Sequence, residues 1–381
     1  MSKLVDKNNG NPFEMQMEQD GNRNEKRESN KKLSTQALKK LFKYIFIDGL
    51  SGMAVGLFAT LIIGTIVENI GKIFVGGVGE YLTIMGQFAK FLMGAGIALG
   101  MGYKVKKSPL VSISAGVVGM LASFLSKLET GISFSSVGEP LGAFVAAFVA
   151  LEVGSLVSGK TKIDIIVTPL VAILSGSIIA FLIANPIADF MAFLSGIIRT
   201  AGEQQPFLMG VLVAVLMGVF LTMPISSAAI GVALGLDGIV AGAAVVGCCT
   251  QMIGYAVISF RENKWGGLFA QGLGTSMLQM PNLVKKPILW LPPVITSAIL
   301  GPISTCVLKM TSSKVGSGMG TAGLVGIIET FSVMSASEVW WIVLLKIFAI
   351  DIIAPALLCL GIAEIMRKVG WIKEGDLKLD L

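Results

Sequence analysis

The residues that first suggest chemistry lie in the glycine-rich stretch GSGMGTAGLVGIIET. Gly318, Gly320 and Gly323 fit the pattern G-x-G-x-x-G, which in dinucleotide-binding proteins lets the backbone approach a pyrophosphate. Glu338 follows Gly318 by twenty residues, close to where such proteins carry the acid that binds a ribose. The pattern has this meaning only between a β-strand and a helix. Here it follows the uncharged run 287–308, which has the length of a membrane span and no strand alternation, so a nucleotide loop is excluded.

A broken membrane segment explains the same glycines better. Glycine permits irregular backbone where that backbone lines a cavity within a membrane, and Ser317 and Thr321 would add hydroxyl groups to the cavity. Glu329 is the main candidate for ligand contact, because a carboxylate in a membrane segment costs roughly 3 kcal/mol or more without a partner. A carboxylate can accept two hydrogen bonds from a sugar in a fixed geometry. The alternative, an acid in ordinary water at the mouth of the segment, stays open at this point.

A second stretch, WGGLFAQGLGTSMLQMPNLV at 265–284, has the same character. Its core GLGTS at 272–276 is similar to GMGTA at 318–322, and two glycine-interrupted hydrophobic segments indicate the binding site of a transporter. Glycine-rich packing interfaces are the alternative. The density of uncharged hydrogen-bonding groups favours a neutral, polyhydroxylated ligand. The candidate ligand contacts are Gln271, Thr275, Ser276, Gln279 and Asn282, with Gln251 and, at the helix break in MPISSAAI, Ser226 and Ser227.

The elements that must position these residues are membrane helices. The chain has 381 residues, of which 54% are hydrophobic and 14% charged, and its mean hydropathy is +0.79. A soluble protein carries roughly 25% charged residues. Six uncharged runs are each about as long as the ~20 residues that span a bilayer: 49–67, 108–126, 165–188, 206–236, 238–260 and 287–308. These runs predict an all-α polytopic membrane protein.

The expected fold has about ten transmembrane helices and two re-entrant hairpins, the latter formed by the two glycine-broken segments. A tenth pass is expected from the amphipathic stretch 187–200 or from one of the glycine-rich segments. The clear spans are expected at about 45–67, 82–103, 108–126, 140–158, 165–186, 206–225, 236–260, 287–309 and 339–366.

The distribution of charge predicts orientation and tails. Lysines precede the first span and follow the second and fourth, which places the N-terminus in the cytoplasm. Residues 1–38 are polar with few aromatics, and we expect a disordered cytoplasmic tail there. The membrane domain is expected at 39–366 and a cytoplasmic C-terminal tail at 367–381.

The residue inventory also excludes several kinds of chemistry. The chain contains no histidine, and its four cysteines form no C-x-x-C pair. Histidine metal ligands, histidine bases and a phosphohistidine on this chain are therefore excluded. We expect no metal, no cofactor, no catalytic residue and no nucleic-acid partner.

Three stretches together carry a family likeness: MPISSAAI, VGCCTQMIGYAVISFRENKWGGLFAQGLGTSMLQMPN and GSGMGTAGLVG. They resemble enzyme IIC (EIIC), the membrane subunit of the sugar phosphotransferase system. SGKTKIDIIVTPLV, at 158–171, looks like the branch of that family that includes perfringolysin-regulator-like membrane proteins. The likeness covers roughly residues 40–366.

The resemblance implies a homodimeric permease in the bacterial plasma membrane, with a sugar bound between its two hairpins. A separate enzyme IIB, supplied with phosphate by IIA, would phosphorylate the sugar during inward transport. GIIET resembles the segment in which IIC subunits place a sugar-contacting glutamate, which favours Glu329. Well-studied sugar IIC subunits often present a histidine at the sugar site, and this chain has none. The alternative is a membrane sensor or regulator that has the IIC fold but performs no phosphotransfer.

Overall fold

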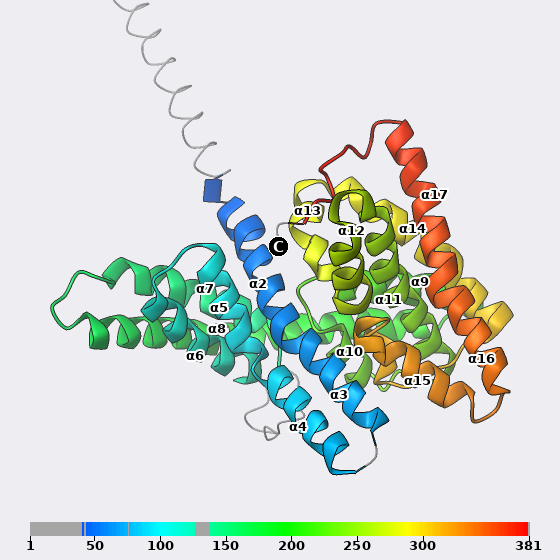
Figure 1. Ribbon diagram of the computed structural model, residues 1–381, viewed down its shortest axis with the longest axis horizontal. Helices are drawn as coiled ribbons and strands as arrows, with labels where there is room; N and C mark the ends of the chain where they lie inside the picture. Colours follow the sequence, from blue (N-terminus) through cyan, green and yellow to red (C-terminus); the bar gives the residue numbers. More distant parts are fainter. Residues whose placement is uncertain (1–39, 42, 75, 126–137, 380–381) are drawn as a thin grey trace, which may run out of the picture. The chain divides into compact units, whose positions relative to one another are not determined.

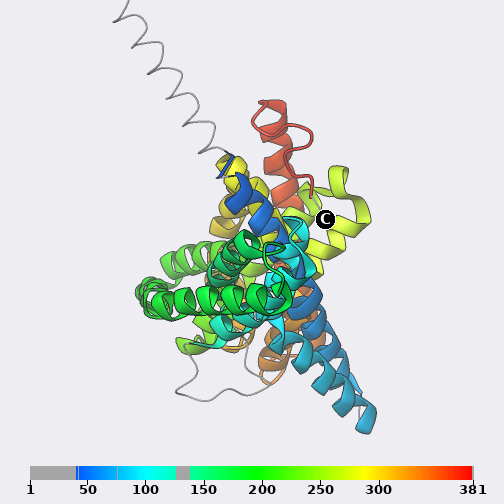
Figure 2. The same ribbon diagram turned by 90° about the vertical axis from the view of Figure 1, so that its left-hand side faces the viewer.

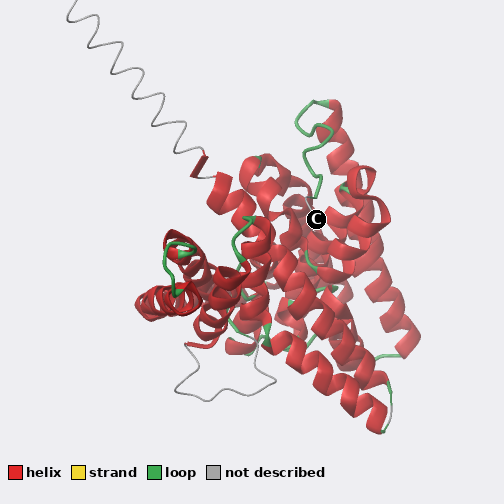
Figure 3. Cartoon of the chain, turned by 60° about the vertical axis from the view of Figure 1, so that its left-hand side comes forward, coloured by secondary structure: helices red, strands yellow, loops and turns green. Residues whose placement is uncertain are grey.

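The structure is a computed structural model that describes residues 40–41, 43–74, 76–125 and 138–379. The predicted disordered tail, 1–38, lies outside the described residues. In the described part, the chain is helical, with an isolated bridge between Gly238 and Ser312 and no strand (Figure 3). The all-α prediction is confirmed. The contacts described below lie within the compact unit that begins at Ile47.

The first apolar run forms one long helix, Lys43–Lys72. Its consecutive parts are η1 (Lys43–Gly49), α2 (Leu50–Leu57), η2 (Phe58–Ile62) and α3 (Ile63–Ile73). The helix extends past residue 67, where the sequence predicted its end. α4 (Gly77–Phe91) returns antiparallel along α3, and the two backbones meet closely because Gly64 lies against Gly86. α5 (Met93–Lys104) follows α4 with a bend of 55° (Figure 1).

Three helices follow, namely α6 (Pro109–Phe124), α7 (Pro140–Val157) and α8 (Asp164–Gly202). α6 begins where it does because the Ser108 side chain accepts a hydrogen bond from the Val111 backbone N–H, and the proline that follows Ser108 occupies the first helical position, where no N–H is needed. α7 begins in the same way, with the Glu139 side chain accepting from Leu141 N–H.

α8 corrects one prediction about the span pattern. The stretch 187–200, considered as a separate pass, continues α8 without a break (green in Figure 2). Pro186 lies inside the helix and does not end it, as is common for proline in membrane helices. At about 1.5 Å per residue, the 39 residues of α8 reach about 58 Å, well beyond the ~30 Å of a bilayer core.

The remaining apolar helices surround α11. They are α9 (Pro206–Thr222), the short α10 (Ser227–Ala233), α11 (Gly238–Ile258), the run η6, α14 and η7 (Pro287–Trp290, Leu291–Pro302 and Ile303–Leu308) and the run α16, η10 and α17 (Trp340–Ile347, Phe348–Ile353 and Ala354–Lys368). α11 packs against α9, α14 and α17. Gly247 allows the contact with α9, since a Cβ there would lie 1.9 Å from the Ala214 carbonyl oxygen.

Among the described residues, six helices are long and apolar enough to cross a membrane, and the bent pair α4–α5 gives a seventh. Three apolar helices are shorter: Pro109–Phe124, Pro206–Thr222 and Ala322–Met334. A polytopic membrane protein is thus confirmed, while the count of ten spans stays a prediction.

Both glycine-rich segments are broken, as predicted. The first contains α12 (Phe260–Phe269), η4 (Ala270–Gly274), η5 (Ser276–Gln279) and α13 (Met280–Lys285). The second contains η8 (Gly316–Gly318), η9 (Ala322–Leu324) and α15 (Val325–Met334). Gly320 and Gly323 both have a φ of +53°, a conformation that glycine adopts without strain. Re-entry of the two segments into the membrane as hairpins stays a prediction.

Candidate functional site

The two broken segments line one cavity of about 400 Å³. This volume lies within the ~300–1,000 Å³ usual for small-molecule sites. Thr275 and Met277 come from the first segment, and Met319, Ala322 and Val325 come from the second. The α2–α3 helix supplies another wall, and Ser226 and Ser227 at the start of α10 also contribute. The cavity therefore joins the three stretches that the sequence singled out.

The α3–α4 pair supplies the charged wall of the cavity. Glu68, on α3, pairs with Lys90 on α4, and both side chains are largely buried, at 11% and 13% exposure. The other oxygen of the Glu68 carboxylate lies 3.5 Å from Lys72 Nζ. Asn69 donates from Nδ2 to the Gly323 carbonyl oxygen at 2.5 Å, which links α3 to the second broken segment. Ion pair and amide thus hold the helix pair and the broken segment around one space.

Three of the eleven predicted ligand contacts line this cavity: Ser226, Ser227 and Thr275. Ser227 donates to the Gly318 carbonyl oxygen at 2.7 Å, so it also ties α10 to the second segment. The hydroxyl oxygens of Ser226 and Thr275 accept hydrogen bonds from the backbone N–H groups of Ala229 (3.2 Å) and Met277 (3.2 Å). Both serve as local caps and still present a hydroxyl to the cavity.

The amides of the first segment form a chain that leads away from the cavity. Gln279 donates to Gln271 Oε1 at 2.9 Å, and Asn282 donates to Gln279 Oε1 at 2.9 Å. Gln279 also donates to the Leu377 carbonyl oxygen at 3.0 Å, and Asn282 to that of Lys378 at 2.9 Å. These side chains hold the residues after α17 against the broken segment. Their contact with a ligand stays a prediction.

Ser276 and Gln251 meet at Thr222, near the end of α9. The Thr222 hydroxyl lies 2.8 Å from Ser276 Oγ and 3.3 Å from Gln251 Oε1. All three residues are fully buried. Gln251 Nε2 has no hydrogen-bond partner within the described part of the chain. Of these groups, none lines the cavity.

In the second segment, the predicted polar residues face the protein interior. Ser317 donates to the Lys314 carbonyl oxygen at 2.9 Å. Thr321 lies 3.4 Å from the Met252 sulfur, a weak acceptor. The lining of the cavity by this segment is apolar, through residues such as Met319 and Val325. Ser317 and Thr321 thus help to position the segment, and their contact with a ligand is untested.

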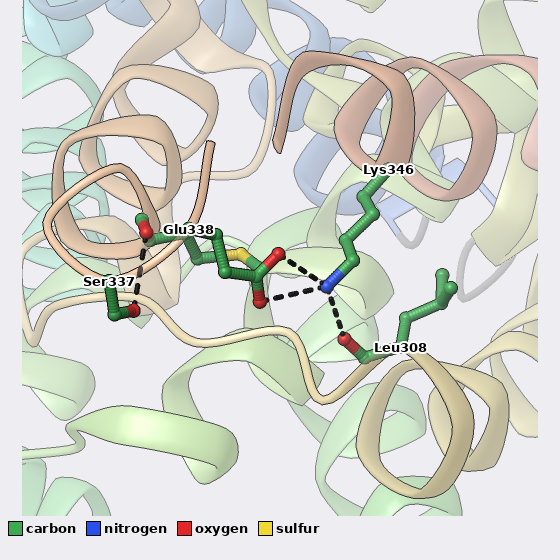
Figure 4. A network of polar contacts seen from close by, with 5 residues as sticks. Leu308, Ser337, Glu338 and Lys346 are labelled. Carbon is green, nitrogen blue, oxygen red and sulfur yellow. Dashed lines mark hydrogen bonds and ion pairs between the residues drawn. The ribbon is translucent and has the colours of Figure 1, made fainter. Parts of the chain in front are cut away.

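Glu329 lies on α15, half-buried, and accepts a hydrogen bond from Ser313 at 2.6 Å. It is not among the residues that line the cavity. Its predicted role as a sugar contact stays a prediction. Glu338, which the nucleotide pattern had marked, pairs with Lys346 at 2.7 Å (Figure 4). Lys346 also donates to the Leu308 carbonyl oxygen at 3.1 Å, so this lysine anchors α16 to η7, and Glu338 neutralises its charge.

Sequence reasoning missed the charged wall. It ended the first span at about residue 67, just before Glu68, and named none of these charged side chains as a ligand contact. The signal was present in TIVENIGK, where Thr65, Glu68, Asn69 and Lys72 follow the spacing i, i+3, i+4 and i+7. That spacing places them on one face of a helix. Polar residues on one face at the end of an apolar run indicate a helix that continues beside a polar space.

The residues after α17 are fastened by carboxylates as well as amides. Asp376 pairs with Lys286 at 2.5 Å. Burial alone would raise the pKa of Asp376, but the hydrogen bonds from Lys286 and the Lys373 backbone outweigh it, so that pKa lies below its ordinary value. Glu262 accepts from Gly375 N–H at 3.1 Å, and burial raises the pKa of its carboxyl.

A second cavity, of about 290 Å³, lies between α7, α8 and α10. Its wall consists mainly of alanine, leucine and isoleucine side chains, with Glu139 as the charged member, and Glu139 caps α7. It offers few groups to orient a polar ligand. Within the described residues, no group of three or more Cys, Asp or Glu side chains is placed to hold a metal ion.

Fold and cavity together define a class of protein. A polytopic helical protein with a partly polar cavity between two broken segments has the architecture of a solute permease. The chain belongs to the phosphotransferase system EIIC family, which matches residues 47–379. This finding confirms the prediction that the protein is the membrane permease component of a sugar phosphotransferase system. It leaves the perfringolysin-regulator-like branch a prediction. No curated protein matches the chain.

Proposed function

We propose that this protein binds a sugar in the 400 Å³ cavity and releases it inward to a separate enzyme IIB for phosphorylation. The bound sugar would contact Ser226, Ser227 and Thr275, and Glu68 and Asn69 line the same cavity. We further propose that the protein is a homodimer in the bacterial plasma membrane, with its N-terminus in the cytoplasm.

One observation carries the proposal: the two similar glycine-broken segments meet at one cavity. GLGTS contributes Thr275 to it, and GMGTA contributes Met319 and Ala322. Paired broken segments are where transporters of several folds bind their substrates. Two segments that served only helix packing would have no need to enclose the same space.

Sugar binding by the purified full chain tests the proposal. The protein in lipid nanodiscs is titrated with a panel of hexoses, their uronic acids and their 6-phosphates, and calorimetry gives Kd. Thr275→Val should weaken binding of the bound sugar about tenfold, because it removes a hydroxyl from a site built to hydrogen-bond its ligand. Absence of binding to every member of the panel would overturn the proposal.

Glu329→Gln separates the cavity from the site that the sequence favoured. If the ligand lies in the cavity, this variant should retain the wild-type Kd while Thr275→Val loses affinity. The opposite pattern would place the sugar at α15. Uptake of labelled sugar with and without added IIA and IIB then tests phosphotransfer, and binding without phosphorylation would favour the sensor alternative.

A further inference from the structure

The charged wall of the cavity specifies the ligand more closely than family membership does. Among the lining residues the titratable side chains are Glu68, Lys72 and Lys90. Two ammonium groups and one carboxylate give this wall a formal charge of +2 − 1 = +1 at neutral pH. A neutral sugar would leave that charge uncompensated when it displaced water from the cavity.

The one carboxylate is already engaged on both of its oxygens. Glu68 Oε2 accepts from Lys90, and Oε1 lies 3.5 Å from Lys72 Nζ. An ammonium group has three N–H donors, so each lysine retains donors after this contact. Lys90 is 13% exposed, while Lys72 is 60% exposed. The donors therefore extend from the interior of the cavity wall to its solvent-exposed part.

Two hydroxyl groups that line the cavity add hydrogen-bond donors to those of the lysines. The oxygens of Ser226 and Thr275 accept backbone hydrogen bonds, and neither hydroxyl donates to another described residue, so both protons are available to a ligand. Such a wall matches a ligand rich in acceptors. Carboxylate and phosphate groups are acceptor-only when ionised and form stronger hydrogen bonds with ammonium donors than neutral groups do.

We infer that the ligand is a hydroxylated ring that carries a negatively charged group, a carboxylate or a phosphate, which contacts Lys72 and Lys90. The hydroxyl groups of the ring then face Ser226 and Thr275. This inference rests on the proposed function of the cavity and replaces the neutral solute that the amide-rich sequence favoured. The amides on which that expectation relied bond to the chain itself.

The test compares matched ligands on the purified full chain. Glucose, glucuronate and glucose 6-phosphate, and the corresponding mannose and galactose series, are titrated with inorganic phosphate as a separate probe. One acidic derivative should bind about tenfold more tightly than its neutral parent, with a preference that falls as salt rises. Uronate binding would identify a sugar acid as the transported ligand, and 6-phosphate binding alone would identify the phosphorylated product as the charged ligand of the wall.

Two variants test whether the preference for an acidic ligand comes from the charged wall of the cavity. Lys72→Met should reduce the preference for the acidic ligand about fivefold, because Lys72 is mostly exposed and contributes only modestly. Glu68→Gln should increase it. Lys162→Met, at an exposed lysine away from the cavity, is the control and should change nothing.

Three results would overturn the inference. The first is a neutral hexose that binds as tightly as its acidic derivatives, which would leave the proposed function intact. The second is a preference that survives unchanged in both Lys72→Met and Glu68→Gln. The third is inorganic phosphate that binds as tightly as every sugar derivative. Absence of binding by all probes would instead overturn the proposed function, and the inference with it.

Discussion

The two glycine-broken segments have similar cores, GLGTS and GMGTA, but different means of support. The first is held by side-chain amides, which run from Gln271 through Gln279 and Asn282 to the backbone after α17. The second is held by close backbone packing, because a Cβ on Gly318 would lie 2.4 Å from the Ser227 carbonyl oxygen. The equivalent Gly272 has no such neighbour, and its nearest atom would be 3.5 Å away.

This difference shows that a polar side chain in a broken segment need not be a ligand contact. The first segment has the greater number of polar side chains, and most of them satisfy one another inside the protein. A buried polar group must be hydrogen-bonded whether or not a ligand is near. The polar groups that line the cavity are instead hydroxyls, the Asn69 amide and the charged residues of α3 and α4.

The largest expected effect comes from breaking the amide chain of the first segment. Gln279→Leu leaves Gln271 Oε1, the Leu377 carbonyl oxygen and Asn282 Nδ2 each without one partner. Each buried hydrogen bond that is lost costs about 1–3 kcal/mol, so thermal unfolding should show a large fall in Tm. Thr321→Val in the second segment, which loses only a weak contact to sulfur, should cost about 1 kcal/mol or less. A Gln279 variant with wild-type Tm and a weakened Kd would instead make this amide a ligand contact.

Equivalent glycines should respond differently to the same methyl group. Gly318→Ala forces an overlap with the Ser227 backbone and should destabilise the protein by about 1–3 kcal/mol or more. Gly272→Ala meets only ordinary contacts and should leave Tm within a few degrees of wild type. Gel filtration and thermal unfolding of the two variants measure this. Equal effects would show that both segments depend on close packing.

Neighbouring hydroxyls of the first segment should separate binding from stability. Thr275→Val should weaken ligand binding about tenfold, or ~1.4 kcal/mol, and lower stability only by about 1 kcal/mol through loss of its cap on the Met277 N–H. Ser276→Ala should lower Tm without weakening binding, because its hydroxyl contacts Thr222 outside the cavity. Calorimetry and thermal unfolding on the same samples check both. Loss of affinity in Ser276→Ala alone would move the site toward Thr222.

The smallest effect concerns pH and the residues that support the first segment. The pKa of Asp376 in the folded protein lies below its ordinary value of 3.8, so its pair with Lys286 stabilises the fold above that pH. The contribution is lost as pH falls through the lowered pKa. Glu262 has the opposite sign: its raised pKa favours the folded state below the ordinary value of 4.5, and this contribution is lost as pH rises.

Asp376→Asn should therefore flatten the acid side of the stability profile, and Glu262→Gln should raise stability near neutral pH by removing a half-buried charge. Unfolding in denaturant between about pH 3 and pH 7 measures both variants. A profile unchanged in Asp376→Asn would show that its ion pair with Lys286 contributes nothing in solution.

Much of the fold follows from run length alone, because a membrane helix needs only an apolar stretch of sufficient length. The spans predicted at 140–158, 236–260 and 287–309 agree with α7, α11 and the run through α14 within about two residues. The stretch 187–200 was misassigned because a helix can extend beyond the bilayer, and composition gives no sign of where it stops.

The candidate site was only partly predictable. Broken backbone has a local signature in glycine, so both segments were found. Which way a side chain faces depends on distant partners. Gln279 faces Leu377, 98 residues away, and Asn69 faces Gly323, 254 residues away. No local sequence pattern in either segment indicates these distant hydrogen-bond partners.

The hydrogen bonds between the first broken segment and the residues after α17 also constrain the order of folding. Asn263 bonds to Leu377, which is 114 residues later in the chain. At about 5–20 residues per second, a ribosome needs roughly 6 to 23 s to reach that partner. Throughout this interval the buried amides must be held by water, lipid headgroups or a chaperone. The first broken segment thus gains these partners only after α14 to α17 are made, so its final packing is a late step in folding.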